Sequence, residues 1–567
     1  MPSEDMKTAV APSGLLPALG EVSLAEPPTC TLRVGVTGQR PPKLTDDQIP
    51  EIRNAVREVL TFIRGATEDL VKSNLGYARR EPRFLIVSSL AEGTDRLVAA
   101  EALTLGFRLQ CPLPANRDEY RRDFTAPSSA QAFDELLGKA KAVFEFMGQR
   151  EGTWLEPAAY EAAGRVMLAR TDVLITVWDG ERGEPAGTAQ IVGEAQQAGI
   201  PIVRIPRQNP AQIEFLSQAA GAISDWRNEL RGALITALAA PDSSRDRVPE
   251  FLREAFRRTA GRDPVVEQRD QADQIAKRYA ALYRRAYKTV YSLAPMAVLL
   301  AIAGWWLLGN RSDIDLELLS TCLELLCIIV ILGVTWYGRK RRWHERWLDA
   351  RAMAEQFRSW AFLAPIAQAP PTSRLPPYVS TKATQRDWTG WCFRARVREH
   401  GLSPAVVTPE SLAVYQRQLL QVIAGQAQHH QDKGGERKRT YERMELTTAV
   451  LFAVTGVACF VHLALPELLR LESVAFLTTL AAVTAVLPAV GSALEGLQGQ
   501  GEYQRLSERS EGMCRYFTSL QKQVRGPELQ PLSYAALAQL AHQVAGVMLD
   551  ELSDWRSLVR VRSLHPM

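Results

Sequence analysis

The chain has 567 residues, which is more than one hydrophobic core usually holds, so we expect several domains. Its formal net charge of +4 is too small for a typical nucleic-acid-binding protein, and no nucleic-acid partner is expected. The seven cysteines form no Cys-X-X-Cys pair and no cluster with histidines at zinc-ligand spacing. We therefore expect reduced thiols in a cytosol-facing protein and no metal site.

The first part of the chain is predicted to be a short tail followed by an α/β domain. Residues 1–30 are rich in proline and lack a basic start followed by an apolar run, so they are interpreted as a flexible tail and not as a signal peptide. Residues 31–207 alternate short β-rich runs with helical stretches, which is typical of a Rossmann-like, mostly parallel sheet. Residues 208–268 are predicted to be a helical connector.

The expected strands are Leu32–Thr37, Phe84–Ser88, Phe107–Pro112, Ala142–Phe146, Val173–Trp178 and Pro201–Ile205. The helices expected between them include Asp46–Arg64, Thr94–Thr104, Pro157–Ala169 and Thr188–Gln197.

Three glycine-containing turns follow expected strands, and together they predict a ligand-binding site. Ligands of open parallel sheets bind at the carboxyl ends of the strands, where small residues let backbone N–H groups approach a phosphate. Each turn taken alone is equally compatible with an ordinary tight turn, and Asp95 could simply cap its helix. The predicted ligand-binding residues are Gly35, Thr37, Gly38, Gln39, Arg40, Ser89, Glu92, Gly93, Thr94, Asp95, Asp179, Gly180, Gly187 and Thr188.

Four apolar runs in the second half of the chain are each about 20 residues long, enough to cross a bilayer as a helix. They lack the polar face of an amphipathic helix, although four buried core helices of a soluble domain remain the alternative. Glu324 is the one acid in its run, and we expect it to face a partner, the bundle interior or the outer headgroups. The predicted spans are Tyr291–Gly309, Leu318–Gly338, Leu446–Leu465 and Val474–Leu494.

Basic residues flank these spans mainly on one side, at 277–288, 339–342 and 437–443. By the positive-inside rule, the N-terminal domain and the C-terminus of this multi-pass protein are expected in the cytoplasm.

The two hairpins are similar enough to suggest an internal repeat over residues 269–364 and 407–524. A Pro-containing linker is expected at 365–406 and a C-terminal helical segment at 525–567. Each repeat is expected to end in a long exit helix, Arg339–Ala364 in the first and Glu495–Val524 in the second. The first exit helix carries a coiled-coil-like seam that could pack within one subunit or between subunits. The seam residues are Trp343, Trp347, Ala350, Ala354, Phe357 and Ala361.

The α/β domain resembles the SLOG superfamily, the Rossmann-like group that includes the LOG phosphohydrolases, DprA and the YpsA-like proteins. The resemblance covers Leu32–Pro206 and rests on the turn Gly35–Arg40, the segment Ser89–Asp95 and the run Asp172–Ala195. The two hairpins with their exit helices resemble SLATT domains, the two-span effectors associated with SLOG sensors.

This resemblance implies an effector of bacterial anti-phage defence that acts by abortive infection in the inner membrane. The SLOG domain would bind a nucleotide-derived signal, such as an ADP-ribose derivative or a cyclic oligonucleotide, made by a synthase encoded nearby. The SLATT spans, in a homo-oligomer, would then open a pore in the lipid bilayer or disrupt it. No cofactor beyond that ligand is implied.

An enzymatic alternative depends on one position. LOG enzymes carry a PGGxGTxxE-like motif whose Glu takes part in catalysis, and the matching stretch here is Gly183–Ile191. Ile191 stands where the motif has Glu, and an Ile side chain is neither acid nor base. The departure favours binding over catalysis. A membrane-anchored LOG-like enzyme that cleaves a nucleotide or NAD-like substrate, and a membrane scaffold with a degenerate SLOG fold, remain the alternatives.

Overall fold

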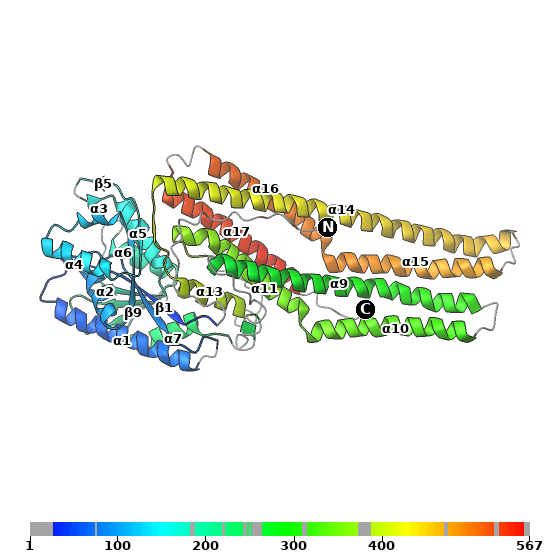
Figure 1. Cartoon of the computed structure of the whole chain (residues 1–567), viewed down its shortest axis with the longest axis horizontal. Helices are drawn as coiled ribbons and strands as arrows, with labels where there is room; N and C mark the ends of the chain where they lie inside the picture. The colour runs from blue at the N-terminus through cyan, green and yellow to red at the C-terminus, as the bar shows by residue number, and fades with distance from the viewer. Residues whose placement is uncertain are drawn as a thin grey trace. The chain divides into compact units, whose positions relative to one another are not determined.

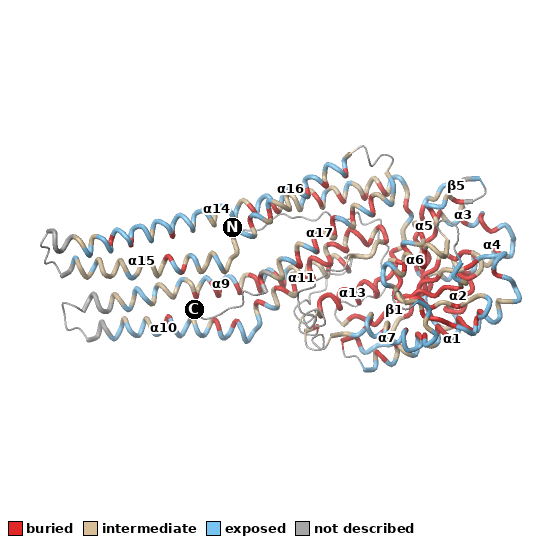
Figure 2. Tube along the Cα trace, turned by 180° about the vertical axis from the view of Figure 1, so that it is seen from behind, coloured by how far each residue is buried: buried red, intermediate tan, exposed pale blue. Residues whose placement is uncertain are grey.

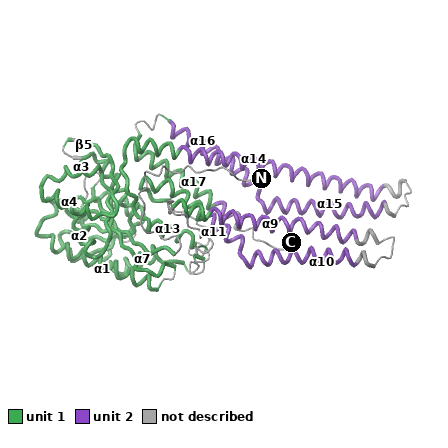
Figure 3. The backbone as a smooth tube through the Cα atoms, viewed as in Figure 1, with its two compact units in different colours: residues 1–272, 352–419, 526–553 green, residues 273–351, 420–525, 554–567 purple. Residues whose placement is uncertain are grey.

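The structure is a computed structural model that describes residues 27–73, 76–152, 154–181, 187–217, 221–241, 247–248, 251, 264–308, 314–371, 387–469, 474–526 and 532–560. The chain divides into two compact units, coloured separately in Figure 3. Unit 1 takes its residues from 1–272, 352–419 and 526–553, and unit 2 from 273–351, 420–525 and 554–567. Most of the predicted tail, residues 1–26, lies outside the described residues.

A mixed, mainly parallel sheet organises unit 1 (Figure 1), and its described residues form nine strands in the order β10-β9-β8-β7-β1-β2-β3-β4-β11. The strands expected from the sequence are all present, which confirms the α/β prediction. They are β1 (Thr31–Gly38), β2 (Arg83–Val87), β3 (Arg108–Leu113), β4 (Ala142–Glu145), β7 (Val173–Val177) and β8 (Ile202–Ile205).

The order of the strands creates a switch point beside β1. The chain runs outward from β1 through β2 and β3 to β4, and then returns to place β7 on the other side of β1. Both neighbours are parallel to β1, with Gly35 paired to Val87 and to Leu174. In sheets of this kind, the carboxyl ends of the strands at the switch point form the usual ligand-binding crevice.

The strand sequences are nearly continuous apolar runs because helices cover both faces of the sheet. All residues of β7 are buried, as expected for a parallel strand between two helical layers (Figure 2). In α1, Ile52, Val56, Val59 and Ile63 recur at helical spacing and are buried, while the opposite face is open to solvent. The helices of this part are α1 (Ile49–Ser73), α2 (Thr94–Thr104), α3 (Arg117–Arg121), α4 (Pro127–Gly138), α5 (Pro157–Ala169), α6 (Thr188–Gln197) and α7 (Trp226–Leu238).

The segment expected to be a helical connector extends the sheet instead. β9 (Glu214–Ser217) pairs antiparallel with β8, and β10 (Gly221–Ile223) pairs antiparallel with β9. In the described part of this region, α7 and the start of α9 (Pro264–Leu308) follow the expectation of helix. Strands this short contain too few residues for a period-of-two pattern to be visible in the sequence.

The expected linker 365–406 also contributes to the core of unit 1. Although residues 372–386 lie outside the described part, α13 (Trp388–His400) is buried on almost every side. After it, β11 (Ala405–Val406) pairs with β4 and extends the sheet. Unit 1 is therefore assembled from segments on both sides of the predicted hairpins.

A buried ion cluster ties α13 to the sheet. Asp172, directly before β7, accepts hydrogen bonds from Arg33 Nη2 at 2.9 Å and from Arg398 Nε at 2.9 Å. All three side chains are less than a tenth exposed. Burial by itself would raise the pKa of Asp172, but the two guanidinium groups outweigh it and hold that pKa well below its usual range.

Unit 2 consists of helices, and the described residues include four that are long and apolar enough to cross a membrane. These four belong to α9 (Pro264–Leu308), α10 (Ile314–Lys340), α14 (Pro409–Leu469) and α15 (Val474–Gly501). Many of their apolar side chains are exposed, among them Leu318, Val457 and Phe460. Exposed apolar surface of this extent is typical of helices that face lipid. Glu324 is half-buried on α10.

Both hairpins are built in the same way. Each second span ends at a non-glycine residue in the left-handed region, Arg342 with φ 53° and Glu502 with φ 48°. A further helix then begins, α11 (Trp343–Leu363) in the first hairpin and α16 (Tyr503–Arg525) in the second. The expected exit helices are therefore separate helices that start after a break, and the sequence marks only the second break with a glycine, Gly501, directly before Glu502.

The seam of the first exit helix packs within the chain. Ala350, Ala354 and Phe357 are almost completely buried. Near the start of α11, Trp343 and Trp347 pack against an aromatic cluster that includes Tyr283 of α9. Of the two interpretations of this seam, packing within one subunit is the one that these contacts support. The last helix of the chain is α17 (Tyr534–Arg560).

The ion cluster gives a first prediction. Asp172→Asn leaves two buried guanidinium groups without a counter-charge, and we expect the free energy of unfolding at pH 7 to fall by about 3–5 kcal/mol. Because the folded-state pKa of Asp172 is depressed, its contribution in the wild type is present above the unfolded pKa and is lost as the pH falls through the folded pKa. Chemical denaturation followed by tryptophan fluorescence measures both effects.

The matched control is Glu194→Gln, which breaks a pair with the largely exposed Arg165 and should cost less than about 1 kcal/mol. Equal losses for the two variants would contradict the role given to the buried cluster.

Candidate functional site

The three predicted turns meet at the carboxyl ends of β1 and β7. Gln39 N–H donates to the Val177 carbonyl at 3.2 Å, and the Gln39 carbonyl accepts from the Thr94 hydroxyl at 3.0 Å. The Thr188 hydroxyl donates to the Gly38 carbonyl at 3.0 Å. The structure thus brings the starts of α2 and α6 against the end of β1, where helix dipoles and free N–H groups favour an anion.

Two glycines permit this close approach. A Cβ added to Gly38 would lie 2.5 Å from the Thr94 side chain, and one added to Gly93 would lie 2.7 Å from the Gln39 carbonyl. Gly93 also has φ 93°, which side chains rarely adopt. Larger residues at these positions would disturb the packing of the turns themselves, so substitutions there cannot separate ligand binding from folding.

Not every predicted site residue lies in the crevice. Gly35 is inside β1, where an added Cβ would meet Thr171 Oγ1 at 2.2 Å, so this glycine allows the end of α5 to approach the strand. Thr37 is paired with Thr176 near the end of β1. Ser89 and Glu92 are half-buried in the turn between β2 and α2.

The third turn is held by a side chain that the sequence did not point to. Asp179 accepts from Arg207 N–H at 2.8 Å and from Arg207 Nε at 2.9 Å, which fixes the loop after β8 to the end of β7. Gly180 has φ 91°, and Gly187 caps α6. Residues 182–186, including the first four residues of the stretch compared with the LOG motif, lie outside the described residues.

The two α6 residues relevant to catalysis are engaged elsewhere. Ile191, at the position of the LOG glutamate, is buried in the hydrophobic core. Glu194 accepts hydrogen bonds from Arg165 at 3.2 Å and from Gln190 at 3.0 Å.

Asp95 is the most unusual titratable group near the crevice. Its side chain is buried, and the Ser88 hydroxyl lies 3.4 Å from its Oδ2. Burial raises the pKa of Asp95 to about 6, against the opposing effect of the Arg40 guanidinium. The N-cap residue of α2 is Gly93, which has no side chain to cap the helix. A carboxyl that titrates near neutrality beside a cation can bind or exchange a proton with a ligand.

A second group of polar residues surrounds Arg40. Its guanidinium lies 5.3 Å from the centroid of the Tyr160 ring, and the residue as a whole is partly exposed. Burial lowers the pKa of Arg40, but Tyr120, Asp95, Tyr160 and Asp123 together raise it above its ordinary value. The Tyr160 hydroxyl donates to Asp123.

These residues around Arg40 were not predicted from the sequence because they belong to no recognisable motif. The available signal was positional, since residues 117–124 come directly after β3 and so reach the same edge of the sheet.

Three buried polar atoms in this region have no hydrogen-bond partner within the described part of the chain. They are Gln39 Oε1, Tyr120 Oη and Arg96 Nη2. Arg96 is fixed by its other nitrogens, which donate to Leu90 and Ser129, and by the Phe124 ring at 4.0 Å. Leaving such groups unsatisfied costs about 1–3 kcal/mol each, so a polar ligand or bound water would be stabilised here.

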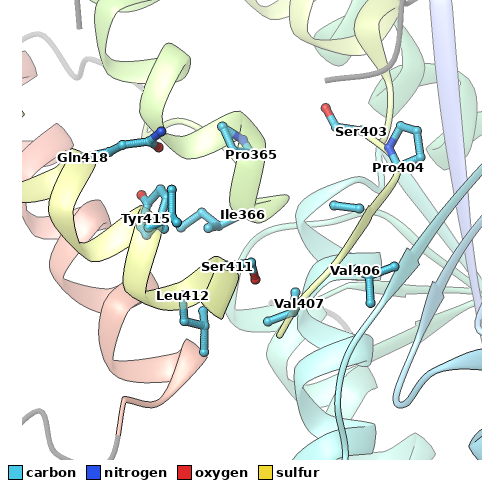
Figure 4. Close-up of a pocket in the computed structure, with 12 residues that line it drawn as sticks. Pro365, Ile366, Ser403, Pro404, Val406, Val407, Ser411, Leu412, Tyr415 and Gln418 are labelled. Carbon is cyan, nitrogen blue, oxygen red and sulfur yellow. The ribbon is translucent and has the colours of Figure 1, made fainter. Parts of the chain in front are cut away.

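A different pocket lies at the edge of the sheet (Figure 4). It is formed by β11 and the first turns of α14, with Ile366, Val407, Leu412 and Tyr415 among its walls. No charged side chain lines it. Because a nucleotide phosphate requires cations or free N–H groups, the turns at the strand ends are the better candidate site for such a ligand.

Comparison with protein-family models, curated proteins and solved structures found no match to this chain. The assignment of the site therefore depends on its geometry and chemistry.

Asp95 supplies the second prediction. Its folded-state pKa of about 6 lies above the unfolded value of about 3.9, so ionisation is unfavourable in the folded protein. The wild type should lose stability as the pH rises from about 4 to 6 and should carry a cost of about 2–3 kcal/mol above that range. Asp95→Asn removes the charge, and we expect it to be more stable than the wild type at pH 7.5 but not at pH 4.

Unfolding midpoints at both pH values measure this effect. Asp134→Asn, which removes an exposed carboxylate paired with Arg121, is the control and should show no such pH-dependent gain. A loss of stability in Asp95→Asn at pH 7.5 would show that the carboxylate is a structural requirement.

Proposed function

We propose that this protein is a membrane effector of bacterial anti-phage defence. Unit 1 senses a nucleotide-derived signal, either an ADP-ribose derivative or a cyclic oligonucleotide, and the helices of unit 2 then permeabilise the inner membrane. The observation that carries the proposal is the crevice at the switch point of the sheet, in a chain that also has four helices suited to a bilayer. The resemblance to SLOG and SLATT domains supplies the biological context.

The crevice offers what a nucleotide requires. The starts of α2 and α6 supply N–H groups for a phosphate, and the exposed residue Arg40 supplies a cation. The unpartnered Tyr120 hydroxyl and Gln39 amide can serve the ribose or base.

The connection between sensing and membrane is covalent and mostly helical. The chain passes between the units at residues 272–273, 351–352, 419–420, 525–526 and 553–554, and all of these points except the fourth fall within a helix. A ligand that binds one arrangement of unit 1 more tightly can shift the helices that continue from it. The basic flanks of the spans favour a cytoplasmic location for unit 1, where the signal would be made.

One observation favours the enzymatic alternative. Asp95 is buried, has a pKa raised by burial to about 6 and interacts electrostatically with Arg40, which is a common combination for a catalytic acid or base. Incubation of the purified protein with NAD and nucleotides, followed by chromatography of the products, tests it. Turnover that is lost in Asp95→Asn would replace the sensor proposal with that of a membrane-anchored enzyme.

The third prediction concerns ligand binding. Arg40→Gln removes the open cation at the crevice, and we expect the affinity for the signal to fall about tenfold to a hundredfold, since hydrogen bonds to charged groups are worth about 1.5–3 kcal/mol. A calorimetric screen with ADP-ribose, NAD and cyclic oligonucleotides measures this loss. Arg64→Gln, on the exposed side of α1, is the matched control and should bind normally.

The same two variants test the effector role. Cells that express the wild type or Arg64→Gln together with the signal should take up a membrane-impermeant dye and stop growing, whereas Arg40→Gln cells should not. Deleting the sensor is not informative, because unit 1 is assembled from three stretches of the chain. Confirmed ligand binding with intact membranes would refute the effector proposal while leaving the binding site in place.

A further inference from the structure

The last turns of α10 carry a groove with two chemically different ends. One end is apolar and the other is cationic, and both lie on the surface of the helix. The apolar end is formed by Ile329, Leu332 and Gly333, and the cationic end by Trp336, Arg339 and Lys340.

The apolar end is shaped by a glycine. No atom lies within 4 Å of the position that a Gly333 Cβ would take, so the surface is open there. Ile329 and Leu332 beside it are each more than half exposed. An extended acyl chain can lie along this open surface.

The cationic end carries positive charge next to an indole. Lys340 Nζ lies 4.6 Å from the centroid of the Trp336 ring, and Arg339 is exposed beside it. Arg341 in turn lies over Tyr337 at 5.4 Å. Aromatic rings with adjacent Lys and Arg are typical of the level of the lipid headgroups.

The spacing of the two ends matches one leaflet. Ile329 and Arg339 are ten residues apart, which is about 15 Å along a helix. Half of a hydrocarbon core of roughly 30 Å has the same depth. With the cations at the headgroup level, the apolar end therefore reaches about the middle of the bilayer.

We infer that this groove binds one molecule of an anionic phospholipid, with its phosphate on Arg339 and Lys340 and an acyl chain along Gly333. A free phosphate would make no contact with the apolar end. A zwitterionic lipid gains less electrostatic stabilisation from two cations than an anionic lipid does. The second hairpin lacks the feature, since residues 496–502 at the end of α15 contain no Lys or Arg. The inference goes beyond signal sensing and requires only that α10 is inserted in a bilayer, as proposed above.

The test uses the full-length protein in a neutral detergent, with lipid binding measured by native mass spectrometry. Phosphatidylglycerol should bind at least tenfold more tightly than phosphatidylcholine, and inorganic phosphate should not compete with it. Arg339→Gln combined with Lys340→Gln should weaken phosphatidylglycerol binding about tenfold or more, on the scale of about 1 kcal/mol per cation. Gly333→Leu should also weaken it by occupying the open surface, without loss of the helix, because leucine is a better helix former than glycine.

The matched control is Arg439→Gln combined with Arg443→Gln, which removes two exposed cations from α14 and should leave binding unchanged. Equal binding of the two lipids, competition by phosphate, or an equal loss in the control would each overturn the inference. Carbonate extraction of the wild type from membranes checks insertion separately, so a failure of the membrane proposal is distinguishable from a failure of the groove.

Discussion

The buried cluster of Asp172 with Arg33 and Arg398 is the interaction on which unit 1 depends. It joins the start of β7 to β1 and to α13, although Asp172 and Arg398 are 226 residues apart in the chain. Three buried charges are tolerable only because the hydrogen bonds among them replace water. The cluster aligns β1 and β7 at their amino ends, and this alignment places their carboxyl ends side by side at the switch point.

Unit 1 contains a second buried carboxylate, Asp95 on α2, whose pKa is shifted in the opposite direction. Two guanidinium groups hydrogen-bond to Asp172 and depress its pKa, whereas burial dominates at Asp95 and raises its pKa to about 6. The first arrangement stabilises the fold, and the second leaves a destabilised group beside Arg40. A protein retains such a cost where a ligand or a reaction uses it, which is a physical reason to place function at the carboxyl end.

Features that appear as local sequence patterns could be predicted from the sequence. Features that depend on contacts between distant segments could not. The β1 and β7 strands and the four long apolar helices could be predicted because apolar runs bounded by turns need no partner to be recognised. β11 and α13 were missed because two paired residues leave no period and because α13 is buried only through the sheet it meets. In the candidate site, the glycine turns were visible, but Tyr120 and Tyr160 approach Arg40 only in the folded chain.

The order of segments along the chain also restricts how the hairpins can respond to a ligand. Each hairpin segment, 273–351 and 420–525, is preceded and followed by residues of unit 1, so neither is tethered at one end only. The inbound helices α9 and α14 run from unit 1 into the apolar segments as single helices, with Pro295 inside α9, whereas the outbound paths are interrupted at Arg342 and Glu502. A continuous helix transmits rotation and tilt, and a break absorbs it. A change in unit 1 should therefore drive the first span of each hairpin, while the second span follows through the joint at its end.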